Sequence, residues 1–129
     1  MITPTDFAGV KTITMGVHAG RILQITTGVA IAFFPGAETN PGDWIRDEVS
    51  FLMGPTLGDV PPNFVSCNAI VFVATFDQAG ASNSFGWGID EAWADYNQQE
   101  KQVRVHARIV SKTPQSEIIR LGFVVHTFT

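Results

Sequence analysis

The chain has 129 residues, of which 45% are hydrophobic and only 16% charged, and its formal net charge at pH 7 is −4. This length predicts one domain over residues 1–129 with a core of its own. The acidic balance argues against a general binder of phosphate backbones, so we expect no nucleic-acid partner. Ten Phe and three Trp beside so few charges favour burial of some apolar surface between subunits.

Cys67 is the one cysteine, which excludes an intrachain disulfide and a cysteine-based zinc framework. It precedes an apolar run, and we interpret it as a small core residue rather than a nucleophile. Residues 1–6 lack the basic and apolar regions of a signal peptide, and no apolar run reaches about 18 residues, so we expect no membrane span. Secretion by another route and a place in a virion both stay open.

Three segments in the first half of the chain have the β-branched and apolar pattern of strands: residues 12–17, 21–34 and 44–53. Gly28, in the middle of the second segment, predicts a bulge, a bend or two strands in succession. Pro and Gly punctuate the stretches that follow the second and third segments, which we predict to be loops.

The second half contains the strongest predicted strand, residues 64–77, which is apolar on both faces and is therefore expected to be central or to form a subunit interface. Residues 84–89 alternate aromatic with small side chains. Residues 90–96 show the only helical tendency, of one or two turns. The last two predicted strands, residues 102–112 and 118–128, are separated by a short loop, and we expect them to pair as an antiparallel hairpin.

The alternation in residues 102–109 is strict and places a row of basic side chains on one face of a strand. These side chains are Arg104, His106 and Arg108. Arg120 and His126 share a parity and would join the same face if the last two strands pair. Guanidinium groups donate in pairs to carboxylates, phosphates or vicinal hydroxyls, and histidine adds pH dependence. The alternative is a solvated sheet face, or cross-strand pairs with Glu117 or Glu100.

An aromatic and acidic segment lies between residues 87 and 97. Trp87 and Trp93 near Asp90 supply an aromatic face and a hydroxyl acceptor, which is the chemistry that sugar binding needs. The alternative for each Trp is a core or interface anchor. Asp90, Glu91, Asp95 and Asn97 are also oxygen ligands of the kind that calcium takes, but their spacing matches no EF-hand loop. Asp90 with Asp95, or Asp77 with either of them, is a further candidate for the acid/base pair of a glycosidase.

Five segments between residues 48 and 114 follow one another in a recognisable order. They are Val49-Ser50-Phe51, Pro61-Pro62, residues 70–77 ending in Asp77, residues 103–111, and Thr113-Pro114. This order resembles the H-type lectin family. The resemblance implies a small β-sandwich that assembles as a trimer, binds galactose-type sugars at subunit boundaries and contacts the sugar through Arg104. The chain differs from the family in the long segment 78–101 and in having one strand after residue 114.

Short strands with Gly and Pro turns predict an all-β antiparallel β-sandwich with one short helical segment near residues 90–96. The first functional hypothesis is a lectin-like carbohydrate-binding module that acts as a homo-oligomer, a trimer or a multiple of one. Its predicted ligand-binding residues are Arg104, His106, Arg108, Trp87, Trp93 and Asp90. We expect no catalytic residue, metal or cofactor, since no P-loop, G-x-S-x-G, H-E-x-x-H or C-x-x-C motif occurs. The alternatives are a structural subunit of a virion, phage tail or surface appendage, and a small enzyme of unknown reaction.

Overall fold

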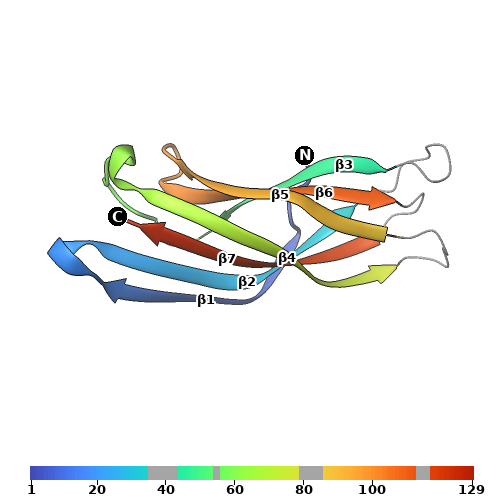
Figure 1. Ribbon diagram of the computed structural model, residues 1–129, viewed down its shortest axis with the longest axis horizontal. Coiled ribbons are helices and arrows are strands. Elements are labelled where there is room, and N and C mark those ends of the chain that lie inside the picture. Colours follow the sequence, from blue (N-terminus) through green and yellow to red (C-terminus); the bar gives the residue numbers. More distant parts are fainter. Residues whose placement is uncertain (35–43, 54–55, 79–85, 113–116) are drawn as a thin grey trace.

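The computed structural model describes residues 1–34, 44–53, 56–78, 86–112 and 117–129, and two antiparallel sheets pack face to face in it (Figure 1). One sheet has four strands in the order β1-β2-β7-β4 and the other has three in the order β3-β6-β5. The strands are β1 (Asp6–Gly16), β2 (Ile22–Phe34), β3 (Ile45–Met53), β4 (Ser66–Gln78), β5 (Gly86–Asn97), β6 (Gln102–Lys112) and β7 (Glu117–Phe128). The predicted all-β sandwich is confirmed.

Two short 3-10 turns, η1 (His18–Gly20) and η2 (Pro62–Phe64), complete the described elements. None of the helical segments in these residues is long and apolar enough to cross a membrane. The hairpins β1–β2 and β5–β6 stay within one sheet, whereas the other connections cross between sheets. Ile2 forms a parallel bridge with Val49, so the first residues of the chain lie along the free edge of β3.

The prediction that the last two strands form a hairpin is wrong. β6 pairs with β3 and β5, whereas β7 pairs with β2 and β4, so the two strands are central in opposite sheets. A short loop joins two strands of a sandwich as readily as it closes a hairpin, and each strand has an apolar side that must face the core. Arg120 and His126 therefore lie in the sheet opposite Arg104.

The helical segment predicted for residues 90–96 is also wrong, because these residues belong to β5 and pair with β6 to the end of the strand. A bulge between Ile89 and Glu91 precedes this part of the strand. Beyond the bulge, Glu91, Trp93 and Asp95 point outward and alternate with small residues that point inward. Pairing along a whole neighbouring strand outweighs the helical preference of Ala and Glu.

The predicted irregularity at Gly28 lies in the partner strand. β2 pairs with β7 without interruption, whereas β1 has a register shift between Ala8 and Lys11, opposite Gly28. Gly9, inside this bulge, has a φ of 61°, a backbone conformation that glycine adopts at little cost. The bulge redirects β1 after Phe7, whose ring packs against the core.

The core consists of the inward side chains of both sheets. Three phenylalanine rings from both layers, Phe7, Phe51 and Phe123, meet with centroids 5.2–6.4 Å apart. The strongest predicted strand, β4, is only partly included in this core. It is an edge strand whose outward Ile70 and Phe72 are exposed, so the expectation that both of its faces are covered is not met within one chain.

We expect Gly28→Ala to lower the free energy of unfolding by about 1–3 kcal/mol through overpacking. A Cβ at this position would lie 2.8 Å from Phe123 Cζ and 3.0 Å from Val10 Cγ2, and Phe123 is fully buried and cannot move aside. Gly122→Ala is the control, since its Cβ would overlap the half-exposed ring of Phe72, which can swing outward. Urea unfolding measures both, and a Gly28 variant as stable as the Gly122 variant contradicts the expectation.

Candidate functional site

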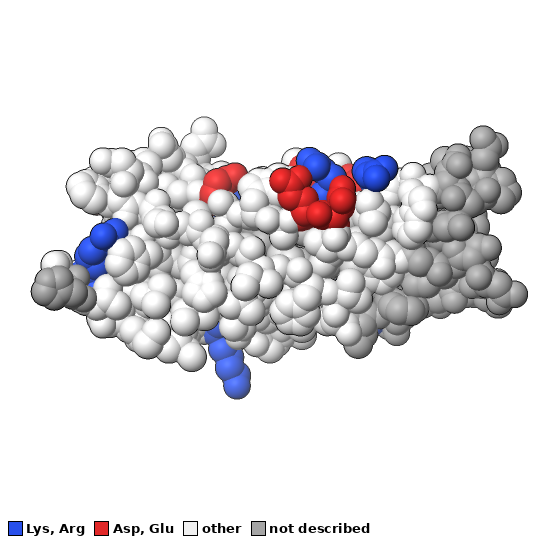
Figure 2. Space-filling model, viewed as in Figure 1, with Lys and Arg blue, Asp and Glu red and all other residues white. Residues whose placement is uncertain are grey.

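The outward side chains of β3, β6 and β5 form a face that we call the charged face. On β6, Arg104, His106 and Arg108 point outward and alternate with buried Val103, Val105, Ala107 and Ile109, which confirms the alternation predicted from the sequence. The neighbouring strands add Arg46, Glu48, Asp90, Glu91, Trp93 and Asp95 to this face. Figure 2 shows charges gathered in one area of the upper sheet, while most of the rest of this view is uncharged.

His106 lies at the centre of the charged face, with a side chain only 13% exposed. Its Nδ1 is 2.6 Å from Glu48 Oε1, and its Nε2 is 3.1 Å from Asp95 Oδ2 but without the geometry of a hydrogen bond. The ring stacks on Trp93 with a centroid separation of 4.9 Å and an interplanar angle of 4°. His106 therefore organises this face and has little surface left for a ligand.

Arg108 and Asp90 also lie in pairs within the chain. Arg108 Nη1 donates to Glu91 Oε2 at 2.8 Å, and its guanidinium lies 5.7 Å from the centroid of the Trp93 ring. Asp90 faces Arg46 at 3.8 Å. These partners are well exposed, so each pair contributes little to stability. The partners differ from those weighed in the sequence, Glu100 and Glu117.

Arg104 differs from its two neighbours on β6. Its Nη1 donates to the buried Ser50 Oγ at 3.0 Å, and within the described residues it makes no ion pair. The guanidinium also borders a shallow pocket of about 320 Å³. The other lining residues are Thr3, Pro4, Phe7, Ser50, Phe51 and Leu52. Arg104 is thus the member of the predicted row that combines a cation, unused N–H groups and an adjoining hollow.

The two tryptophans predicted to stack on a ligand lie on opposite faces of the sheet. Trp93 is directly opposite His106, whereas Trp87 is opposite the buried Ser111 and packs against the core. Both have odd numbers and would share a face in a regular strand, but the bulge after Ile89 reverses the alternation. The structure therefore brings Trp93 to the basic row and leaves Trp87 beneath it.

The remaining sequence candidates are placed as follows. Asp90, Glu91 and Asp95 each face a basic partner, and the described residues contain no group of three or more His, Cys, Asp or Glu suited to a metal ion. The side chain of Asp77 lies outside the described part of the chain. Asp90 is therefore paired with Arg46, whereas Asp95 lies 3.1 Å from His106 Nε2.

Sequence reasoning missed Glu48 and Ser50, which contact the basic row from a strand more than fifty residues away in the chain. It also missed a larger shallow pocket, of about 630 Å³, at the end of the sandwich. There, Arg21 stacks on Phe128 with its guanidinium 4.1 Å from the ring, and the exposed Phe64 lines the same pocket. Phe64, which follows Pro61-Pro62 closely in the sequence, is the residue that could have pointed to this pocket.

Cys67 packs against the core, in agreement with its interpretation as a structural residue. Burial raises the pKa of its thiol, and the Asp95 carboxylate raises it further. A half-buried thiol with a raised pKa is a poor nucleophile. Cys67 is therefore not a candidate catalytic residue.

Comparison with protein-family models, curated proteins and solved structures finds no match to this chain. The resemblance to the H-type lectins stays a prediction, and its last segment, Thr113-Pro114, lies outside the described residues. The functional argument therefore depends on the geometry of the charged face.

We expect a double-mutant cycle of His106→Ala and Glu48→Ala to give a coupling free energy of about 1 kcal/mol, as for a short hydrogen bond to a charged group near the surface. The cycle of Arg46→Ala and Asp90→Ala is the control. Its longer and more exposed pair should couple by less than about 0.5 kcal/mol. Chemical unfolding of the single and double variants measures both coupling free energies. Equal values for the two pairs would show that His106 does not organise the charged face.

We expect iodoacetamide to modify Cys67 in the native protein several-fold more slowly at neutral pH than in the urea-unfolded chain. The physical reason is the raised pKa of the buried thiol together with limited access. Mass spectrometry over time measures the modified fraction, and the native rate should increase as the pH rises. Equal rates in the folded and unfolded states would contradict the burial of this thiol.

Proposed function

We propose that this protein is a non-catalytic carbohydrate-binding module whose ligand lies on the charged face beside Arg104. The supporting observation is that Arg104 borders a hollow of about 320 Å³ and makes no ion pair among the described residues. Five N–H groups on a planar fork suit vicinal hydroxyls or a sugar carboxylate, and one of them is held by Ser50. This contact orients the guanidinium before a ligand arrives.

Acceptors and an apolar surface lie close to this donor. Asp95 is the cross-strand partner of Arg104 in β5, and its side chain is more than half exposed. Leu52, opposite Arg104 in β3, lines the pocket together with Pro4. A sugar presents hydroxyls at its edge and C–H groups on its ring faces, so a donor, an acceptor and an apolar surface side by side match its chemistry.

Trp93 and His106 have a supporting place in this proposal. Their stacked rings form a rigid platform next to Arg104, and the carboxylates of Glu48 and Asp95 fix it. Arg108 and Asp90 lie farther along the same face, where a ligand longer than one sugar would reach them. Trp87, on the inward side of β5, takes no part.

A second candidate function is that of a structural subunit of a virion, phage tail or surface appendage. The observation that favours it is the exposed apolar outer face of the other sheet, which no described part of the chain covers. The two functions predict different results for the same variant. Only a carbohydrate-binding module needs Arg104, because Arg104 lies in the sheet opposite this apolar face.

The test is a glycan array of neutral and acidic sugars, followed by titration of any ligand found. We expect Arg104→Ala to weaken binding by about tenfold to a hundredfold, the loss of one or two hydrogen bonds to a charged group. Arg46→Ala is the matched control, since it removes an exposed arginine from the same face and should leave affinity unchanged. Circular dichroism shows whether both variants keep the native fold.

Binding that survives Arg104→Ala would place the ligand elsewhere, and the pocket lined by Arg21 and Phe64 would be the next site to mutate. No binding to any glycan by a correctly folded protein would remove the proposal and favour the structural function.

A further inference from the structure

The outer face of the four-stranded sheet exposes large apolar side chains from all four strands, and we call it the apolar face. Large side chains that point outward from β1, β2, β4 and β7 are between 41% and 60% exposed. They are Ile13, Met15, Phe33, Ile70, Phe72 and Ile118. Cross-strand neighbours connect them, since Ile13 pairs with Ile25, Phe33 with Ile118, and Ile70 with Val124. The exposed groups therefore have apolar cross-strand neighbours along much of this face, and the row that contains Asp6, Ile31 and Arg120 lies between Phe33 and Phe72.

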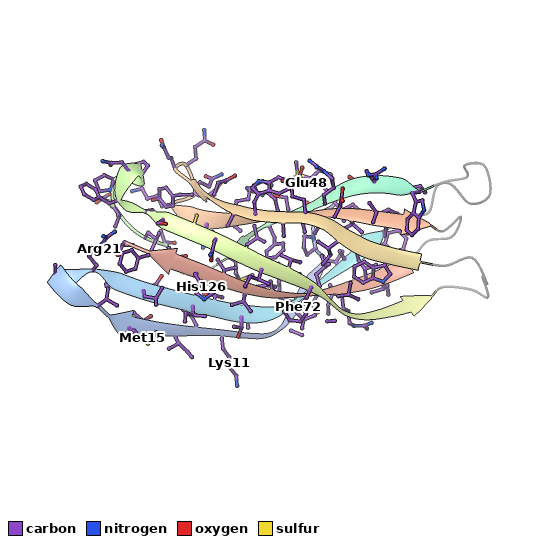
Figure 3. All side chains as sticks on the ribbon, in the orientation of Figure 1. Lys11, Met15, Arg21, Glu48, Phe72 and His126 are labelled. Carbon is purple, nitrogen blue, oxygen red and sulfur yellow. The ribbon has the colours of Figure 1, made fainter. Side chains whose placement is uncertain are left out.

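Charges on the apolar face are few. Among the described side chains, Asp6, Lys11, Arg120 and His126 point to this side, and Arg21 lies over the ring of the outward Phe128 at one end of it. Asp6 and Lys11 belong to the edge strand β1. Figure 3 shows Lys11 and Met15 projecting from β1 on the side of the molecule away from Glu48 of the charged face. The two outer faces of the sandwich thus have opposite character, and the charged face is the one suited to water.

The apolar face is also smooth at its centre. Gly122 of β7 has no side chain, and the ring of Phe72 from β4 covers it so closely that an added Cβ would overlap the ring. The ring of Phe72 consequently lies across the neighbouring strand β7 instead of standing upright. A flat, apolar sheet face packs well against another sheet, at about 10 Å between the layers.

The size of the apolar face matches a stable protein interface. Its strands have 11 to 13 residues. With a rise of about 3.3 Å per residue and a strand spacing of about 4.8 Å, the whole face of the four strands, polar positions included, covers roughly 700–800 Å². A standard interface buries about 800 Å² per partner, whereas the largest apolar patch of a typical monomer is about 300–600 Å². The face is large enough to need a permanent cover and nearly sufficient for a full interface.

We propose that a second copy of this chain covers the apolar face, with the two four-stranded sheets packed against each other. An exposed surface this apolar favours association with a partner that is present whenever the folded chain is present. A second copy of the same chain meets this condition. A two-fold interface requires a self-complementary surface, and a flat face with few charges meets that condition. A lipid surface suits it less, because the net charge of the chain is −4.

This inference is independent of the sugar site, since it concerns the opposite sheet. The first experiment uses the unmodified protein. Light scattering or sedimentation should give twice the mass of one chain, or a larger even multiple, and dilution should lower this mass while fluorescence of an apolar dye rises. The proposal is overturned if the protein is still monomeric at a concentration of about 100 μM, because a dimer with a micromolar dissociation constant would form at that concentration.

Matched variants then test the surface. Ile70→Glu places a charge on the apolar face and should shift the mass to that of the monomer, while Phe64→Glu should not. The two residues are matched, since Ile70 is 56% exposed and Phe64, outside the apolar face, is 58% exposed. If Ile70→Glu does not fold, Ile13→Glu at the opposite edge of the same face replaces it. A dimer that survives the charge on the apolar face overturns the proposal.

Glycan titration of the same samples separates the two proposals. If the apolar face is the interface and Arg104 the ligand site, Ile70→Glu becomes monomeric but keeps its single-site affinity for the glycan, whereas Arg104→Ala loses affinity and stays dimeric. Monomeric wild-type protein that attaches to neutral lipid vesicles would instead assign the face to a membrane and overturn the self-association.

Discussion

The packing of β6 against β7 is the constraint on which the rest of the structure depends. These are the central strands of the two sheets, and each contributes alternate residues to one core cluster, such as Val105 and Ile109 from β6 and Leu121 and Phe123 from β7. Once these sides are buried, the alternation of a strand sends every other residue outward. Arg104 and His106 therefore point to the outside of one sheet, and Gly122, which the ring of Phe72 covers, lies on the outside of the other.

The two outer faces differ in how their side chains are arranged at the surface. On the charged face, most of the ionic groups are paired within the chain, and His106 is held by Glu48, Asp95 and the ring of Trp93. Such pairs add little stability when exposed, but they fix the positions of side chains. Arg104 has no such pair among the described residues and is fixed by Ser50 instead. On the apolar face, large side chains such as Ile13, Ile70 and Phe72 are left about half exposed.

The sequence predicted the features that depend on neighbouring residues and failed at those that depend on residues far apart in the chain. The period of two in residues 102–109 is a local pattern, and the outward row followed from it correctly. The sandwich architecture followed from several short strands with Gly and Pro turns, which are also local patterns. Pairing between strands is not local: the same short connection fits a hairpin or a crossing between sheets, so the placement of Arg120 and His126 was wrong. The bulge after Ile89 leaves no clear mark in the sequence, yet it separates Trp87 from Trp93. Glu48 could not be identified, because its contact with His106 requires the register of β3 against β6.

The relation between the two faces bears on what kind of binding protein this would be. If the apolar faces of two copies pack together, the charged faces of the pair point in opposite directions, because each lies on the far sheet of its own sandwich. Two Arg104 sites so arranged favour connecting two separate surfaces over gripping one surface twice. A trimer of the kind implied by the resemblance to H-type lectins would instead hold its sites around one axis. The choice of interface therefore determines whether weak sugar contacts add up on one target or bridge two.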